Sequence, residues 1–321
     1  MEKVSPSLNS PIHHAGHMTT ARKHLIDPNV PLFYHLVSGC VRHSFLCGFD
    51  KVSGNNYDHR KEWLIERIHH LAQFFAVQIY AYTIMSNHFH LALYYDPLAC
   101  QSWSDEEVAE RWLSACDGEP DQGKARAVAK AVLLGNAHRL RHARQCLGSL
   151  SMFMKHLKQP IARRANLEDG CSGHFFEQRF YSGALLSEES VLAAMAYVDL
   201  NPIRAKIAES LHQCEHSSIA ERLNVVENTP ERLQAALQPL VSGLVTSQPV
   251  VTITLALYVE HLQRVVEESV RLPQAVAADK PTRWQRQLAM LRKRQRVYGP
   301  LDLIRGWIES RGMQLREAPL P

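Results

Sequence analysis

Alternating apolar and polar positions predict two antiparallel strands over residues 80–95, joined by a tight turn at 85–87. β-Branched and aromatic residues fill both flanks, and Ser86 and Asn87 favour turns. Successive side chains of a strand point to opposite faces, so one face of the second strand would enter the core through Phe89, Leu91, Leu93 and Tyr95. The other face carries His88 and His90, about 7 Å apart along the strand, which lets both imidazoles converge on one divalent ion. A bare His-x-His also occurs on ordinary sheet surfaces, because the pattern is short.

Helical spacing of apolar residues predicts the elements on either side of this hairpin. A strand is expected at 32–38 and a helix at 58–76. A second helix is expected at 149–166, which Pro160 should kink or divide, followed by an aromatic-rich closing strand at 173–186. The order strand, helix, strand, strand, helix, strand is that of a ferredoxin-like, RRM-like βαββαβ arrangement, an α+β fold.

The remaining segments predict how the chain is divided. Residues 1–28 are polar and Pro-containing, which indicates a flexible N-terminal arm, and 29–221 would form the main domain. Within it, 97–147 reads as a helical insertion. Residues 222–321 are expected to form a basic helical C-terminal region.

The C-terminal region begins with a weakly patterned connection at 222–250, and helices are expected at 252–270, 284–296 and 301–310. Residues 281–321 hold nine Lys and Arg against three acids, whereas the whole chain has a net charge of only +4. The last two helices could form a helix-turn-helix DNA reader or a basic packing appendage.

Composition excludes several classes of protein. The seven cysteines are odd in number, widely spread and never arranged as Cys-x-x-Cys, which favours reduced thiols and a cytoplasmic location. No run of about 18 apolar residues predicts a membrane span.

A second stretch, 187–202, complements the histidine strand. Ser187 and two acids begin a helix in which Tyr197 and Asn201 are four residues apart and share a face, and Pro202 should end it. If this helix lies against the sheet, the Asn201 amide oxygen becomes a third ligand beside His88 and His90. Two imidazoles and an amide oxygen suit Mg or Mn, and imidazole favours Mn. Taken singly, Tyr197 could be a core tyrosine and Asn201 a helix cap.

The two stretches Met85-Ser86-Asn87-His88-Phe89-His90 and Tyr197-Val198-Asp199-Leu200-Asn201-Pro202 resemble the single-tyrosine HUH transposases, most closely the REP-associated tyrosine transposases. The resemblance covers roughly residues 20–220, and 97–147 and the region beyond 222 exceed the minimal family domain. It implies Tyr197 as nucleophile and His88, His90 and Asn201 as ligands of Mg or Mn.

The activity implied is metal-dependent cleavage and transfer of single-stranded or hairpin DNA through a 5′-phosphotyrosine, by a monomer or homodimer that needs no membrane. Basic residues would contact phosphates, and the candidates are Lys155, Lys158, Arg163, Arg164, Arg179, Arg292, Lys293 and Arg294.

Three rival functions remain. The first is a non-catalytic nucleic-acid-binding protein on an RRM-like sheet. The second is a phosphodiesterase with two His-x-His motifs, against which the lack of a second such motif in a matching strand counts. The third is a transposase relative retained by its host with the same chemistry.

Overall fold

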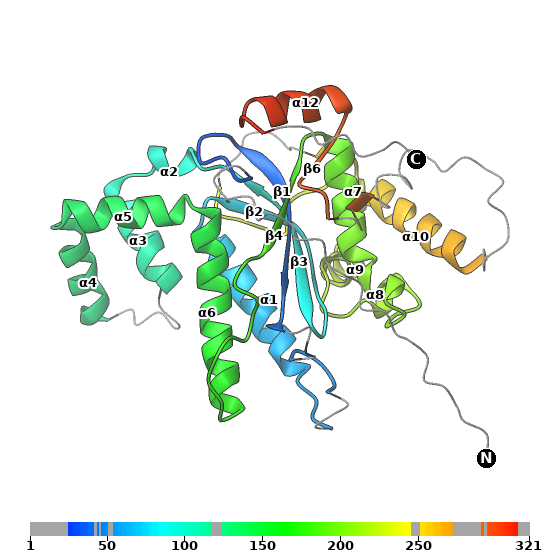
Figure 1. Cartoon of the computed structure of the whole chain (residues 1–321), viewed down its shortest axis with the longest axis horizontal. Coiled ribbons are helices and arrows are strands. Elements are labelled where there is room, and N and C mark those ends of the chain that lie inside the picture. The colour runs from blue at the N-terminus through cyan, green and yellow to red at the C-terminus, as the bar shows by residue number, and fades with distance from the viewer. Residues whose placement is uncertain are drawn as a thin grey trace, which may run out of the picture.

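A six-stranded sheet with helices on both faces forms the centre of the protein, which is therefore an α+β protein (Figure 1). The computed structural model describes residues 25–41, 44, 46–50, 54–116, 123–244, 251–271, 290–291 and 294–313. Most of the expected N-terminal arm, 1–24, lies outside the described residues. No helix in the described part of the chain is both long and apolar enough to cross a bilayer.

The strand order is β5-β2-β3-β1-β4-β6. The four longer strands are β1 (Leu32–Gly39), β2 (Val77–Ile84), β3 (His88–Tyr95) and β4 (Tyr181–Leu185), and each pairs antiparallel with its neighbour. Two short strands extend the edges: β5 (Val241–Ser242) pairs antiparallel with β2, and β6 (Val297–Tyr298) pairs parallel with β4.

The hairpin of β2 and β3 turns at 85–87 as the sequence predicts, and the Met85 amide donates to the His88 carbonyl at 2.8 Å. The alternation of β3 is also confirmed. Phe89, Leu91, Leu93 and Tyr95 pack into one core, whereas Ala92 belongs to the core on the opposite face.

Helices α1 (His59–Ala72) and α6 (Leu150–Glu168) cover the first face of the sheet (Figure 1). Their apolar stripes reach it through Leu64, Ile68, Phe153 and Leu157. Helix α6 runs unbroken through Pro160, so of the two expected effects, a kink or a division, the division does not occur. The buried residues Leu157 and Ile161 anchor the helix on both sides of the proline, and this packing outweighs the lost hydrogen bond.

The described part of the expected insertion folds into the helices α2 (Ala99–Ser102), α3 (Asp105–Cys116), α4 (Lys124–Leu134) and α5 (Ala137–Leu147). They extend the molecule beyond the end of α6 (Figure 1). The closing strand β4 starts at Tyr181 rather than at 173, which corrects the prediction. Phe175 and Phe176 are instead buried in the α6-side core, with one isolated bridge between Phe176 and Cys40.

Helix α7 (Glu188–Asp199) covers the second face, followed by α8 (Asn201–Arg204) and η3 (Leu211–Gln213). The segment expected to be a weakly patterned connection contains the end of α9 (Ser218–Asn228), η4 (Pro230–Gln234) and β5. Helix α10 (Leu255–Arg271) packs beside α7, and α12 (Leu301–Glu309) lies across the end of the sheet (Figure 1).

Residues 297–300, between the last two expected helices, contain the short strand β6, which joins the sheet beside β4. Most of the helix expected at 284–296 lies outside the described residues. The C-terminal region therefore adds a strand to each edge of the main sheet.

Candidate functional site

The two histidines of β3 lie on the α7 side of the sheet. His90 is buried and His88 is half-buried, and their ring centroids are 4.8 Å apart. The neighbouring strand β1 places Val37 opposite His90 and Gly39 opposite His88. Both imidazoles therefore converge at the end of the sheet where the β2–β3 hairpin turns.

A third histidine, His35 of β1, belongs to the same cluster. Its ring stacks on His90 with centroids 5.2 Å apart, and a hydrogen bond of 3.0 Å joins His35 Nε2 to His90 Nδ1. This bond orients the His90 ring so that Nε2 faces the site, which is how neighbouring groups commonly fix metal-ligating histidines. His35 was not among the residues predicted for the site. Strand alternation could have indicated it, because its neighbours Tyr34 and Leu36 point into the opposite core.

Burial keeps these imidazoles neutral. It lowers the pKa of His35 to about 3, and the charge of Arg294 contributes to the same shift. Burial, followed by the nearby His35 and His88, lowers the pKa of His90 well below its usual value. A metal-binding imidazole must be neutral, so the environment of His90 suits that role.

Helix α7 brings Tyr197 to the histidines because its sheet-facing residues are small. Ala193, Ala194 and Ala196 are buried in the same core as Ala81 and Ala92 of the sheet. Ser187 begins the helix with a capping box that satisfies free backbone donors. The half-buried Tyr197 ring lies 5.6 Å from the ring centroids of both His35 and His90.

Asn201 also reaches His90, because its amide Nδ2 is 3.3 Å from His90 Nε2. The helix, however, ends differently from the prediction. Helix α7 ends at Asp199 with Leu200 as its C-cap, and Pro202 is the second residue of α8 rather than the stop of α7. Asn201 is therefore not the cap of α7, and its contact with His90 is the interaction that explains its position.

The donor set fits a divalent ion. Rotation of the Asn201 amide would turn its oxygen toward the space that His90 Nε2 faces, with His88 next to it. Among the described residues, no three His, Cys, Asp or Glu side chains are grouped closely enough to hold a metal, so an amide oxygen would have to complete this set. The carboxylate of Glu177 lies next to Gly39, the residue of β1 that pairs with His88. A Cβ added to Gly39 would be 3.5 Å from Glu177 Cδ.

A buried carboxylate fixes the end of α7 between Tyr197 and Asn201. Asp199 accepts hydrogen bonds from the Ser218 hydroxyl and, at 2.6 Å, from the Tyr258 hydroxyl of α10. Burial raises the pKa of Asp199 to about 6, and these two hydrogen bonds oppose that rise. Helices α9 and α10 therefore hold the segment that presents the tyrosine and the amide.

Further aromatic and basic residues surround Tyr197. The guanidinium carbon of Arg204 is 4.5 Å from the Tyr197 ring centroid. Tyr181, at the start of β4, donates to the Gln295 carbonyl and shares a 2.6 Å hydrogen bond with Tyr298. Burial raises the pKa of Tyr181 above its ordinary value. The sequence analysis missed Arg204 and Tyr298, which only the folded chain brings to the site.

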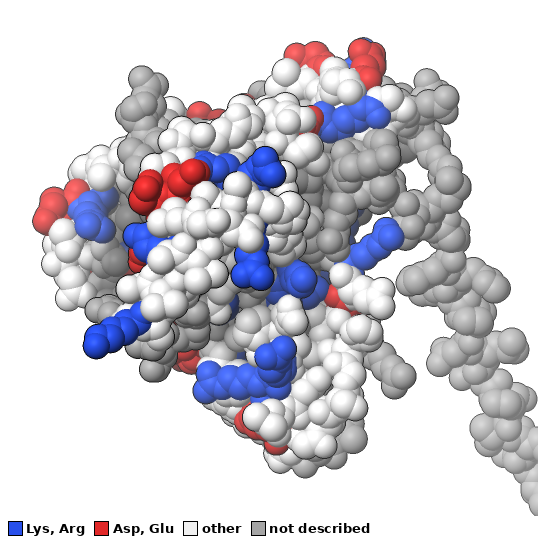
Figure 2. Space-filling model, turned by 90° about the vertical axis from the view of Figure 1, so that its left-hand side faces the viewer, with Lys and Arg blue, Asp and Glu red and all other residues white. Residues whose placement is uncertain are grey.

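The predicted DNA-binding residues of α6, Lys155, Lys158, Arg163 and Arg164, lie on the other side of the sheet from Tyr197, since α6 and α7 pack against separate cores, and Arg179 lies in the segment between α6 and β4. Lys155, Arg163 and Arg179 are exposed. Lys158 donates to the Glu177 carbonyl at 2.7 Å, and Arg164 lies over the Trp63 ring at 3.7 Å. Figure 2, viewed from the insertion side, shows several groups of Lys and Arg side chains there. Of the C-terminal candidates, Arg294 is exposed, whereas Arg292 and Lys293 lie outside the described residues.

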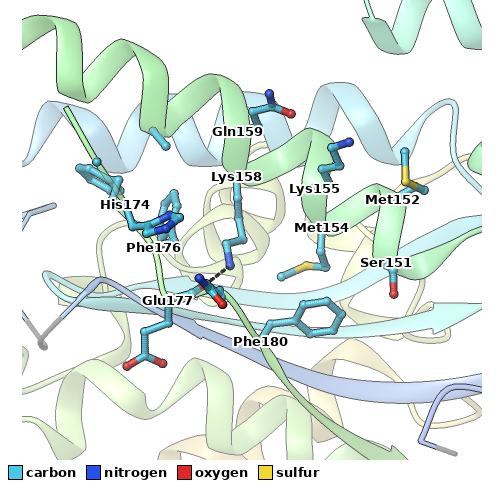
Figure 3. A pocket seen from close by; sticks show the side chains of 14 residues that line it. Ser151, Met152, Met154, Lys155, Lys158, Gln159, His174, Phe176, Glu177 and Phe180 are labelled. Carbon is cyan, nitrogen blue, oxygen red and sulfur yellow. Dashed lines mark hydrogen bonds between the residues drawn. The ribbon is translucent and has the colours of Figure 1, made fainter. Parts of the chain in front are cut away.

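A cavity of about 580 Å³ lies between α6 and residues 173–180 (Figure 3). Lys155 and Lys158 line it together with Met154, Phe176 and Phe180. Figure 3 shows the Lys158 amine directed to the Glu177 carbonyl, with the Glu177 carboxylate turned away from the cavity. The cavity is thus separate from the histidine and tyrosine cluster.

Neither a family model nor a curated protein matches the sequence. Among solved structures, the chain is similar to a REP-associated tyrosine transposase bound to a REP hairpin, with 10% sequence identity and a TM-score of 0.36. The match covers 69% of this chain and 93% of that chain. Because a TM-score of this size does not establish a common activity, a functional assignment has to rest on the geometry of the site.

Proposed function

We propose that the protein is a metal-dependent DNA endonuclease and strand transferase of the single-tyrosine HUH type, a transposase acting on single-stranded or hairpin DNA. The observation that carries the proposal is that one imidazole, His90, has Tyr197 5.6 Å from its ring and the Asn201 amide 3.3 Å from its Nε2. The strand order β2-β3-β1-β4 with antiparallel neighbours is the order of a ferredoxin-like βαββαβ domain and supports this assignment.

His88, His90 and Asn201 would hold the ion, either Mg or Mn. When bound, such an ion polarises a phosphate and makes it more electrophilic. The hydroxyl of Tyr197 is the nucleophile. Its oxygen forms a bond to phosphorus and loses its proton, while the bond from phosphorus to the 3′-oxygen breaks and that oxygen gains a proton. The resulting 5′-phosphotyrosine preserves the phosphoester bond, so a second 3′-hydroxyl can reverse the step and join strands without ATP.

The alternative of a non-catalytic RRM-like binding protein fits the structure less well. RRM domains stack bases on aromatic side chains of an open sheet face. Here α1 and α6 cover one face and α7 covers the other, and the facing residues are buried in two cores.

Peptide mapping of the covalent adduct tests the proposal. The protein is incubated with single-stranded hairpin DNA and Mn, and a DNA-linked peptide containing Tyr197 is sought by mass spectrometry. Trypsin leaves Tyr181 and Tyr197 together, because no Lys or Arg lies between Arg179 and Arg204. A protease that cuts after Glu188 or Glu189 separates the two tyrosines. An adduct on the Tyr181 peptide would refute the assignment of the nucleophile, and the absence of any adduct across a hairpin library would refute the activity.

A further inference from the structure

The C-terminal region approaches the site closely from the β4 side. Gly183 pairs with His35 across the sheet, and a Cβ on Gly183 would lie only 2.6 Å from the Tyr298 ring and 3.1 Å from the Gln295 carbonyl oxygen. Any larger residue at 183 would displace this segment. Together with the hydrogen bonds of Tyr181 to Gln295 and Tyr298, this packing places residues 294–298 beside the histidine cluster.

Arg204 reaches the same site from α8. It follows Asn201 by three residues, so the two side chains lie on the same side of this short helix. Its guanidinium covers the Tyr197 ring at 4.5 Å, which leaves its donors next to the nucleophile. A planar guanidinium presents donors in a fork that matches phosphate oxygens.

Arg294 adopts an unusual backbone conformation with φ of 48°. Residues other than glycine seldom adopt this left-handed region, and asparagine or aspartate are the more usual exceptions. Arg294 directly precedes Gln295, whose carbonyl accepts the Tyr181 hydrogen bond, so its backbone lies beside the histidine cluster, and its side chain is exposed. A guanidinium over the Tyr197 ring and a second one on the adjoining segment favour an anionic ligand.

We propose that Arg204 and Arg294, from two separate segments, form the anion site that holds the attacked phosphodiester beside Tyr197. This inference rests on the proposed function, because the phosphodiester is that of the DNA strand. The C-terminal region then completes the active site of its own chain.

Four variants separate charge from backbone strain. Arg204→Gln and Arg294→Asn remove the charges, and Asn tolerates the left-handed conformation at 294. We expect each to lower the cleavage rate at saturating DNA by about 100-fold, as for loss of one donor to a transition-state oxyanion. Arg204→Lys and Arg294→Lys should recover part of that loss. Full cleavage activity of Arg294→Asn, whatever its thermal stability, would overturn the role of Arg294 in the site.

Binding of tungstate gives a readout that does not require cleavage. Tyr197→Phe protein in EDTA is titrated with tungstate by calorimetry, and its metal-free crystals are soaked in tungstate to locate the ion by anomalous scattering. We expect one ion that contacts both guanidinium groups and binds at least about tenfold more weakly after Arg204→Gln or Arg294→Asn, a loss of about 1.4 kcal/mol. Lys206→Gln, in the same turn as Arg204 and exposed, is the matched control and should not change the affinity.

The outcomes distinguish this inference from the proposed function. Tungstate binding that is absent, or equal in all variants, overturns the arginine site even if the Tyr197 adduct forms. Tungstate held by both arginines without any DNA adduct supports the anion site and counts only against the proposed strand cleavage.

Discussion

The two faces of the sheet are built from different kinds of residue. On the α1 and α6 side, large side chains such as Phe75, Phe89, Phe153 and Leu157 fill the core. On the α7 side, alanines hold the helix close to the sheet, and His35, His90 and Asp199 are buried there. Large apolar residues stabilise the fold through buried area, whereas burying polar groups costs free energy unless they are hydrogen-bonded. The α1 and α6 face therefore stabilises the fold, whereas burying the polar groups of the candidate site on the α7 face costs free energy.

The largest expected effects come from replacing one aromatic residue on each face of the sheet. Tyr197→Phe removes only a hydroxyl, so we expect stability to stay within about 0.5 kcal/mol while covalent DNA adduct falls below detection. Phe153→Ala should instead lower the free energy of unfolding by about 3–5 kcal/mol, because it leaves a cavity next to Phe75. Urea unfolding and gel analysis of adduct measure both quantities. Full adduct formation by Tyr197→Phe would mean that the nucleophile is another residue.

The next test concerns the ligands of the metal. His90→Ala and Asn201→Leu should each weaken Mn binding by at least about tenfold, whereas Asn201→Asp retains an oxygen ligand and should bind Mn. Calorimetry measures the affinity in a chain whose His13, His14 and His17 are replaced by Gln, since those imidazoles could bind Mn themselves. His59→Ala is the control, because His59 is exposed and pairs with Glu168 on the other face of the sheet. Unchanged affinity in Asn201→Leu would show that the third ligand lies elsewhere.

Residue periodicity was enough to group those residues of the candidate site that lie on the same strand or helix. The face shared by His88 and His90 follows from strand alternation, and Tyr197 and Asn201 were placed together by helical spacing. Their common contact with His90 required only that the helix lie against the sheet. The prediction of the helix end was wrong because Pro202 fits the first turn of α8, where a missing amide hydrogen has no cost.

Contacts between distant segments could not be read from local patterns. The roles of His35, Arg204 and Tyr298 depend on which strands pair and on how α8 and β6 pack. Residues 297–298 form a two-residue strand, too short to have a recognisable period, and in the sequence they lie between two expected helices. The short strand forms because it pairs with β4, a tertiary preference that overrides the local sequence.

A smaller effect should separate the buried tyrosines of the two faces. Tyr258→Phe removes a 2.6 Å hydrogen bond to the buried Asp199 carboxylate, and Tyr95→Phe removes a 2.8 Å bond to the Gly148 carbonyl on the α6 side. Hydrogen bonds to charged groups are stronger, so we expect losses of about 1.5–3 kcal/mol for Tyr258→Phe and about 0.5–1.5 kcal/mol for Tyr95→Phe. Urea unfolding at pH 7.5 measures both. Equal losses would indicate that Asp199 is protonated in the folded protein at that pH.

The smallest expected effect concerns the basic surface on the α6 side of the sheet. Lys155 and Arg163 are exposed on α6, on the opposite face from Tyr197, and Arg179 is exposed in the segment before β4, so we expect all three to contact DNA phosphates without taking part in cleavage. Each phosphate contact with single-stranded DNA contributes about 0.7 to the slope of log affinity against log salt. Replacing all three with Gln should therefore reduce the slope by up to about 2, while the rate of cleavage at saturating DNA stays the same.

The control replaces the exposed Arg141, Arg232 and Arg264, which removes the same charge from the insertion and the C-terminal region. Equal slopes in the two triple variants would mean that the α6 surface is an ordinary solvated face, and a reduced rate at saturation would mean that the two faces of the sheet do not act independently.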